Sequence, residues 1–294
     1  MKQTILAISL VVVLGSCKST KQESTTIKQD TKMETTTKLS NKEKTIAVLN
    51  SIETGDQMAV SYINPTNYTQ HNLGVADGLA GFGELLHHAP EGGFKVKNIR
   101  AFEDGDYVFT QTEYDFFGPK IGFDVFRFEN GLIVEHWDNL IAIQPKNPSG
   151  HTQTDGETII TDLDKTESNR RVVENFLNDI LYAHKTNFTD YINPAKYIQH
   201  NPAIADGLEG FGAAMKYFAE NGLVMEFEKT HKILAEGNFV LAISEGKFGK
   251  GEHTSFYDLF RLEDDKIVEH WDVIENILPE ADRKNTNGKF NFPK

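Results

Sequence analysis

The chain has 294 residues, of which 39% are hydrophobic and 25% are charged, so it has enough apolar material for the cores of two ordinary domains. Its formal net charge is −13, and no basic stripe runs through the part that is expected to fold. This charge argues against nucleic acid as a partner, because a nucleic-acid surface needs clustered Lys and Arg.

The first residues predict export and lipid attachment. An apolar run over residues 5–14 is too short to span a bilayer comfortably, and it ends in Leu14-Gly15-Ser16-Cys17, which resembles the bacterial lipobox. Cys17 is the only cysteine of the chain. We therefore predict a lipoprotein signal peptide over residues 1–16, and a lipidated Cys17 with a flexible polar tether over residues 17–42. The alternative is an ordinary signal peptide followed by a stray cysteine.

These features predict a protein of the cell envelope that is attached to the membrane only through its N-terminal lipid. An acidic body is not drawn to anionic lipid by its charge, so the anchor has to hold it. Lys18 follows the cysteine where an Asp would signal retention at the inner membrane, and this favours the outer membrane.

The rest of the chain is a tandem duplication. Residues 62–83 and 191–212 are identical at 15 of 22 positions when aligned at an offset of 129. Residues 124–138 and 258–272 are identical at 10 of 15 positions at an offset of 134. We therefore predict two copies of one domain, over residues 43–144 and 167–281, with a linker over residues 145–166 and a tail over residues 282–294.

Both copies show the same order of predicted elements. A first helix is expected over residues 43–62 and 167–185, followed by an Asn-Pro turn, a Gln-His-Asn loop and a second helix over residues 79–89 and 208–221. Strands are expected to close each copy, in the first over residues 94–102, 107–114, 121–128 and 132–143. Helices followed by an antiparallel meander predict an α+β fold, in which helices pack on one face of a curved sheet and leave a cleft for a small-molecule ligand.

The last two strands of the first copy carry candidate site residues. Asn130-Gly131 predicts a two-residue turn, which would place Phe123 opposite Asp138, Val125 opposite His136 and Arg127 opposite Val134. Strand alternation puts His136 and Asp138 on one face. The second copy repeats the pattern with Tyr257, Arg261, His270 and Asp272.

These residue types suit acid/base chemistry. A carboxylate in an apolar pocket has a raised pKa, which suits a general acid or base, and a neighbouring His can donate a hydrogen bond to an oxyanion. The loop residues would supply further donors. We therefore predict proton abstraction beside a carbonyl group, without metal or cofactor. The predicted catalytic residues are Asp138, His136, His71, Asp272, His270 and His200, and the predicted binding residues are Asn72, Asn201, Arg127, Arg261, Phe123 and Tyr257.

Other interpretations of these residues stay open. Asp138 could pair with Arg127, and the loop residues His71 and Asn72 could cap the following helix. Two histidines and one carboxylate also suggest a mononuclear metal site. Known sites with a His-x-Asp pair have their second His downstream, whereas the other motif His lies upstream here.

The repeated blocks resemble the SnoaL-like branch of the NTF2-like superfamily. The motifs that carry the resemblance are Tyr-x-Gln-His-Asn, the Asp-Gly and Gly-Phe that follow it, and Asp-x-Phe-Arg with Ile-Val-Glu-His-Trp-Asp. The resemblance implies a cone-shaped α+β barrel in each copy, with a deep pocket and frequent dimerisation through the sheet. In the polyketide cyclases of this family an Asp on a late strand is the acid/base of an aldol closure, with His nearby. Asp138 and Asp272 match that Asp.

The resemblance leaves two functional hypotheses. One is a cofactor-independent cyclase, lyase or isomerase that acts on a small carbonyl compound. The other is a non-catalytic module that binds a small apolar ligand or a protein partner, because the superfamily contains many such binders. In both cases we expect the two copies to pack as a pseudo-dimer.

Overall fold

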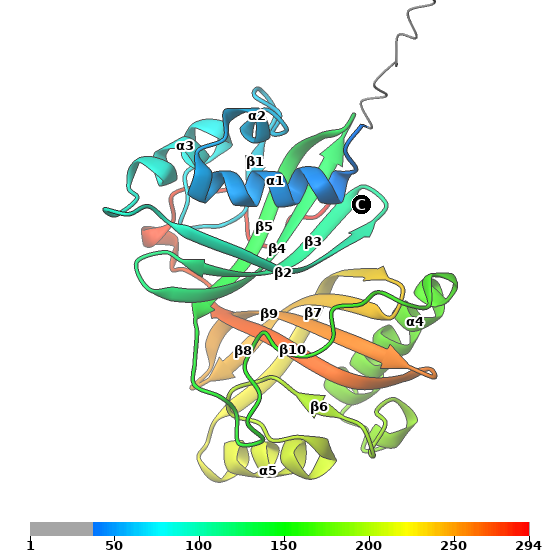
Figure 1. Cartoon of the computed structure of the whole chain (residues 1–294). Helices are drawn as coiled ribbons and strands as arrows, with labels where there is room; N and C mark the ends of the chain where they lie inside the picture. Colours follow the sequence, from blue (N-terminus) through cyan, green and yellow to red (C-terminus); the bar gives the residue numbers. More distant parts are fainter. Residues whose placement is uncertain (1–37, 294) are drawn as a thin grey trace, which may run out of the picture. The chain divides into compact units, whose positions relative to one another are not determined.

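The computed structural model describes residues 38–293, and the predicted signal peptide, Cys17 and most of the tether lie outside these residues. In the first copy, α1 covers Asn41–Thr54, α2 covers Gln57–Val60 and α3 covers Gly78–His87 (Figure 1). The strands are β1 (Thr69–Gln70), β2 (Lys95–Asp104), β3 (Tyr107–Asp115), β4 (Pro119–Glu129) and β5 (Leu132–Ala142). Ser40 caps α1 with a capping box, in which its side chain and that of Glu43 bond to each other's backbone N–H.

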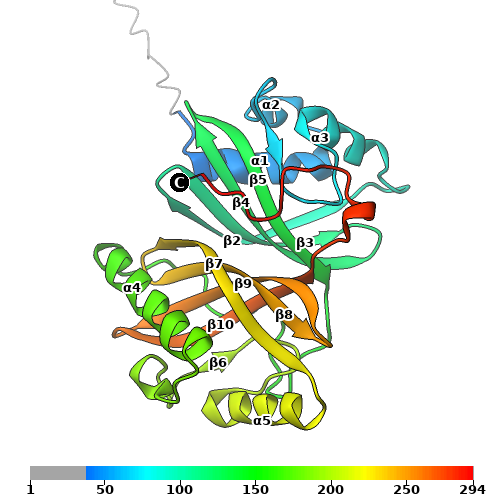
Figure 2. The same ribbon diagram turned by 180° about the vertical axis from the view of Figure 1, so that it is seen from behind.

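The second copy repeats this order (Figure 2). Its first helix is α4 (Thr166–Phe176), which continues as one π-helical segment over Leu177–Tyr182, and its second is α5 (Gly207–Glu220). The strands are β6 (Ile198–Gln199), β7 (Val224–Glu236), β8 (Phe239–Gly249), β9 (Glu252–Glu263) and β10 (Lys266–Asn276). Short 3-10 turns lie at Leu163–Lys165, Phe188–Asp190 and Glu280–Asp282.

Each copy forms one five-stranded mixed sheet packed against its helices, which confirms the predicted α+β class. The strand orders are β1-β5-β4-β3-β2 and β6-β10-β9-β8-β7. Strands β2–β5 and β7–β10 are antiparallel meanders, and the short β1 and β6 add a parallel edge that the sequence did not predict. Within residues 38–293, no helix is both long enough and apolar enough to cross a membrane.

The predicted pairing of β4 with β5 was wrong by one residue. The turn at Asn130-Gly131 forms as expected, with positive φ at both residues. A β-bulge between Arg127 and Phe128 then shifts the register, because two residues of one strand oppose one of the other. As a result Asp124, and not Phe123, lies opposite Asp138. The second copy has the same bulge and places Asp258 opposite Asp272.

This register fixes which side chains face which core. One face of each sheet packs on that copy's own helices, and the other faces contribute to a single buried cluster that contains residues of both copies. Phe123 and Tyr257 lie in this shared cluster and not in a ligand cleft, which corrects the expectation from the register. Its other large members are Phe102, Phe109, Trp137, Phe239 and Trp271.

The segments that follow β5 and β10 pack across onto the other copy. After β5, the Asn147 side chain donates to the carbonyl oxygens of Gln199 (2.6 Å) and Ile204 (3.0 Å) in the second copy. After β10, the Asn285 side chain donates to the carbonyl oxygens of Asn72 (2.7 Å) and Val75 (2.8 Å) in the first. We call residues 143–162 and 277–293 the crossing arms. Each arm supports the Gln-His-Asn loop of the copy to which it does not belong.

Candidate functional site

A cavity lies between the sheet and the helices of each copy. The cavity of the first copy has a volume of about 110 Å³, and that of the second about 300 Å³. The walls of the second are mostly aromatic, with Phe176, Phe211, Phe218, Phe227, Phe248, Phe256 and Phe260. The polar residues lining the two cavities are Tyr68, Gln70, Asn72, Tyr114, Asp124, His136 and Asp138 in the first, and Tyr197, Gln199, Asn201, Asp258, His270 and Asp272 in the second.

The polar residues of the second cavity form one hydrogen-bonded group. His270 contacts Gln199 Oε1 through Nδ1 at 2.9 Å and Asp258 Oδ1 through Nε2 at 3.0 Å. The Asn201 amide donates to Asp272 Oδ2 at 2.7 Å. One ligating atom each of Asp258, His270 and Asp272 lies within 4.8 Å of the other two. The first cavity has the same bonds with Gln70, Asp124, His136, Asn72 and Asp138.

The Gln-His-Asn loop places its residues on alternate sides. Gln199 and Asn201 point into the cavity, and Gln199 Oε1 accepts from the Asn201 backbone N–H at 3.0 Å. His200 lies between them in sequence and points the other way, where it stacks on Trp271 with ring centroids 4.7 Å apart. His71 stacks on Trp137 in the same way. The expectation that His71 and His200 face the cavities was therefore wrong, because backbone alternation separates i from i+1.

The predicted arginines also lie away from the cavities. Arg127 pairs with Glu135 and Glu129, and not with Asp138 as the alternative interpretation supposed. Arg261 pairs with Glu269 at 2.6 Å and with Glu263 at 2.7 Å. The structure thus brings together His136, Asp138 and Asn72 in one cavity and His270, Asp272 and Asn201 in the other.

Four residues that line the cavities were not predicted from the sequence: Asp124, Asp258, Gln70 and Gln199. Both aspartates open the repeated Asp-x-Phe-Arg block, and the bulge turns them toward the cavity. The glutamines stand two residues before Asn72 and Asn201, so the i, i+2 spacing of a strand could have placed them on the cavity side. All four residues stand in the repeated motifs, but the strand register that turns them toward the cavities could not be read from the sequence.

Tyr114 makes the two cavities different. In the first copy its hydroxyl donates to Asp124 Oδ2 at 2.6 Å. The strand register puts Gly246 in the place of Tyr114 and Phe256 in the place of Gly122. The second copy therefore has no hydroxyl at this point, and the buried Asp258 Oδ2 has no hydrogen-bond partner among the described residues.

A buried lysine also distinguishes the first cavity from the second. Lys289, from the C-terminal crossing arm, is buried with its Nζ 3.9 Å from Asp138 Oδ1. Within residues 38–293, no Lys or Arg forms such a pair with Asp272. Burial raises the pKa of Asp272 to about 6, against the lowering effects of His270 and Asn201. In the first copy, burial raises the pKa of Asp124, the carboxyl that Tyr114 covers.

The histidine of the second cavity is stabilised in its charged form. Burial lowers the pKa of His270, but the hydrogen bond to Asp258 and the charges of Asp272 and Asp258 outweigh burial, and the net direction is upward. In each copy the two carboxylates and the histidine are close enough to hold a metal ion by their ligand types. The same group can also share protons, since each His nitrogen faces an acceptor.

The second copy matches a known protein family. Residues 173–270 match the family model described as SnoaL-like domain, which agrees with the predicted resemblance. The first copy shares its Gln-His-Asn loop, its Glu-His-Trp-Asp strand and its strand order with the second. No curated protein matches the chain.

Several solved structures resemble one copy of the chain. TsrD from Streptomyces laurentii is 23% identical, covers 37% of this chain and 89% of its own, and has a TM-score of 0.30. A SnoaL-like polyketide cyclase from Agrobacterium tumefaciens is 14% identical, with coverages of 36% and 91% and a TM-score of 0.30. An NTF2-like protein from Cytophaga hutchinsonii is 14% identical, with coverages of 36% and 94% and a TM-score of 0.32. Such low scores indicate nothing about substrate or activity.

Proposed function

We propose that the second cavity is a cofactor-independent acid/base site for a small carbonyl compound. The observation that carries the proposal is Asp272, a carboxyl in an aromatic cavity whose pKa is raised to about 6 beside His270 and Asp258. A base with a pKa near neutrality is both ionised and strong enough to take a proton.

The contacts suggest a role for each group. Asn201 holds Asp272 Oδ2, and among the described residues nothing bonds Oδ1, which is free to receive the proton from carbon. The electron pair of the broken C–H bond moves onto the carbonyl oxygen. The positive charge of His270, whose two ring nitrogens are held by Gln199 Oε1 and Asp258 Oδ1, stabilises that oxyanion electrostatically. Proton transfer of this kind needs no metal or cofactor.

We propose that the first copy is the weaker site. Its cavity is smaller, and the Tyr114 hydroxyl hydrogen-bonds Asp124. The buried Lys289, which pairs with Glu275, also lies 3.9 Å from Asp138. We also propose that the fused copies take the place of a homodimer and that the protein acts in the envelope on its N-terminal lipid. The cluster shared by the two sheets supports the first of these two proposals.

The test is α-proton exchange in deuterated water with a panel of ketones and β-keto esters. We expect exchange to rise with pH through about 6, as Asp272 ionises, and to fall by about 100-fold or more in Asp272→Asn. Asp138→Asn is the matched control and should retain most of the rate. A wild-type rate equal to that of Asp272→Asn would refute the proposal.

The aromatic walls favour a second candidate, capture of an apolar ligand without chemistry. Native mass spectrometry of protein purified from its own host tests this. A retained ligand together with no exchange activity would favour binding. A protein that retains no ligand and crosslinks to no partner would contradict this candidate function.

A further inference from the structure

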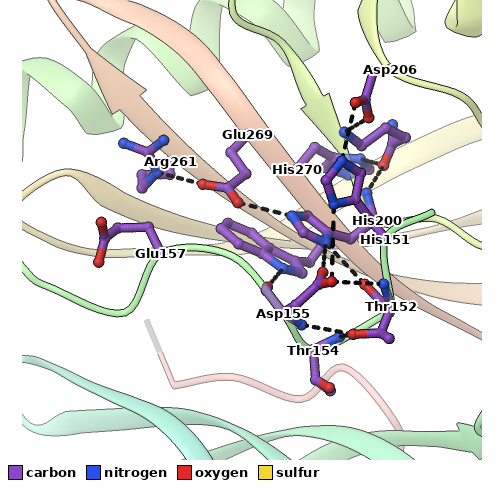
Figure 3. Close-up of polar contacts among 12 residues, drawn as sticks. His151, Thr152, Thr154, Asp155, Glu157, His200, Asp206, Arg261, Glu269 and His270 are labelled. Atoms are coloured by element: carbon purple, nitrogen blue, oxygen red, sulfur yellow. Dashed lines mark hydrogen bonds and ion pairs between the residues drawn. The ribbon is translucent and has the colours of Figure 1, made fainter. Parts of the chain in front are cut away.

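A second group of metal-type ligands lies outside the cavities, where a crossing arm meets the second copy. His151 and Asp155 come from the arm, and His200 comes from the Gln-His-Asn loop (Figure 3). One ligating atom of each lies within 4.8 Å of the other two. His200 Nδ1 is 2.8 Å from Asp155 Oδ1, and His151 Nδ1 is 3.9 Å from Asp155 Oδ2. We propose that these three residues bind a divalent transition metal such as Zn²⁺.

The ligand types and spacing suit such an ion. Imidazole nitrogen and carboxylate oxygen are ligands of Zn²⁺ at about 2.0–2.2 Å, so a tetrahedral site separates its ligand atoms by roughly 3.4 Å. The observed distances bracket that value. The carbonyl oxygen of Thr152, 2.9 Å from His200 Nδ1, is positioned to join them.

The strongest support comes from the residues behind the two histidines. Metal-binding histidines almost always donate their other ring N–H to a carboxylate or carbonyl, which fixes the ring and its tautomer. His200 Nε2 lies 2.8 Å from Glu269 Oε1, and His151 Nε2 lies 3.1 Å from Asp206 Oδ2. Both Nδ1 atoms therefore face Asp155 with their other nitrogen already held. Arg261 in turn holds Glu269 (Figure 3).

The surroundings allow an ion to enter and to stay. The His200 side chain is fully buried, whereas 31% of the His151 side chain and 43% of that of Asp155 are exposed. Arg100 fixes the arm by donating to the carbonyl oxygens of Thr154 and Asp155. The charged groups around the site are mainly acidic, which favours a cation: Asp155, Glu157, Asp206 and Glu269 against Arg100 and Arg261.

The first copy supplies an internal comparison. His71 has the same carboxylate behind it, with Nε2 3.5 Å from Glu135, but its Nδ1 meets the carbonyl oxygen of Gly288 at 2.7 Å. Lys289 follows that glycine where His151 follows Gly150, and no acidic residue stands between it and residue 293. The described residues of the first copy therefore do not repeat this ligand set, and the proposed metal would join the arm to the loop that carries Gln199 and Asn201.

Titration of the chelator-treated full chain with Co²⁺ and Zn²⁺ tests the proposal, in a Cys17→Ser background that removes the only thiol. We expect one Co²⁺ per chain with visible absorption bands, and a Zn²⁺-dependent rise in Tm. His151→Lys, which copies the first domain, and Asp155→Asn should each weaken binding at least tenfold. Both residues are partly exposed, so these variants are expected to fold.

Two control variants locate the ion. His253→Ala removes an exposed imidazole elsewhere, and Asp272→Asn alters the cavity, and neither should change the affinity for Co²⁺. No saturable binding by the wild-type chain would overturn the proposal, and so would binding that His151→Lys and Asp155→Asn leave unchanged. Loss of binding only in Asp272→Asn would place the ion in the cavity and overturn it as well.

Discussion

Replacing Asp272 with Asn should stabilise the protein at neutral pH and not at acidic pH. The folded protein holds the Asp272 proton more tightly than the unfolded chain does, because burial raises its pKa from 3.8 to about 6. Unfolding stability therefore falls as pH rises between these two values and then stays level. The shift corresponds to about 3 kcal/mol at pH 8, and Asn avoids this cost because it carries no charge.

Urea unfolding at pH 4.5 and pH 8 measures this effect. The gain of Asp272→Asn over wild type should be larger at pH 8 by about 2 kcal/mol, because Asp272 of the unfolded chain is already largely ionised at pH 4.5. Asp138→Asn is the control and should show no such gain, because Asp138 faces Lys289. An equal difference at the two pH values would refute the assignment of a raised pKa to Asp272.

Three further predictions concern the contacts around the cavities. Tyr114→Phe should destabilise the protein by about 1–2 kcal/mol, because Asp124 loses a buried hydrogen bond, and proton exchange by the second cavity should not change. Gly156→Ala should cost about 2 kcal/mol or more in thermal unfolding, because a Cβ there would lie 2.1 Å from Glu269, whereas Gly150→Ala, with a similar φ and open space, should cost roughly 1 kcal/mol. Asn285→Ala should speed amide exchange in residues 70–76 of the first copy and Asn147→Ala in residues 199–205 of the second, and the reverse pattern would contradict the crossed contacts.

The sequence predicted the elements well because their signals are local. Hydrophobic spacing and turn residues placed the main helices and strands, although the helix expected over residues 43–62 divides at Gly55 into α1 and α2. Strand alternation correctly put His136 beside Asp138. The partner across the strand depends on the bulge near Arg127, which has no local signal in the sequence. The register error of one residue placed Phe123 opposite Asp138 in place of Asp124, so Asp124 was not predicted as a cavity residue.

The orientation of the loop histidines could not be predicted for a different reason. His71 and His200 are held by tryptophans on another strand and by the crossing arms, and both contacts are distant in sequence. The arms themselves carry a weaker repeat, Lys-Asn-x-x-Gly at residues 146–150 and 284–288. In the structure Asn147 and Asn285 make equivalent hydrogen bonds to the loop of the other copy. So short a repeat in a polar segment was not enough to predict these contacts.

The crossing arms also decide the order in which this protein can be completed during synthesis. The loop of the first cavity rests on Asn285 and Gly288, which are synthesised after the strands of both copies, whereas the arm of the second cavity is synthesised before that copy's own strands. The N-terminal domain, which normally folds first during translation, therefore finishes last here. A stop codon before Asn285 would remove the arm of the first copy and spare that of the second. No single cut separates the two copies and leaves the first with its arm, because residues 277–293 follow the second copy in sequence.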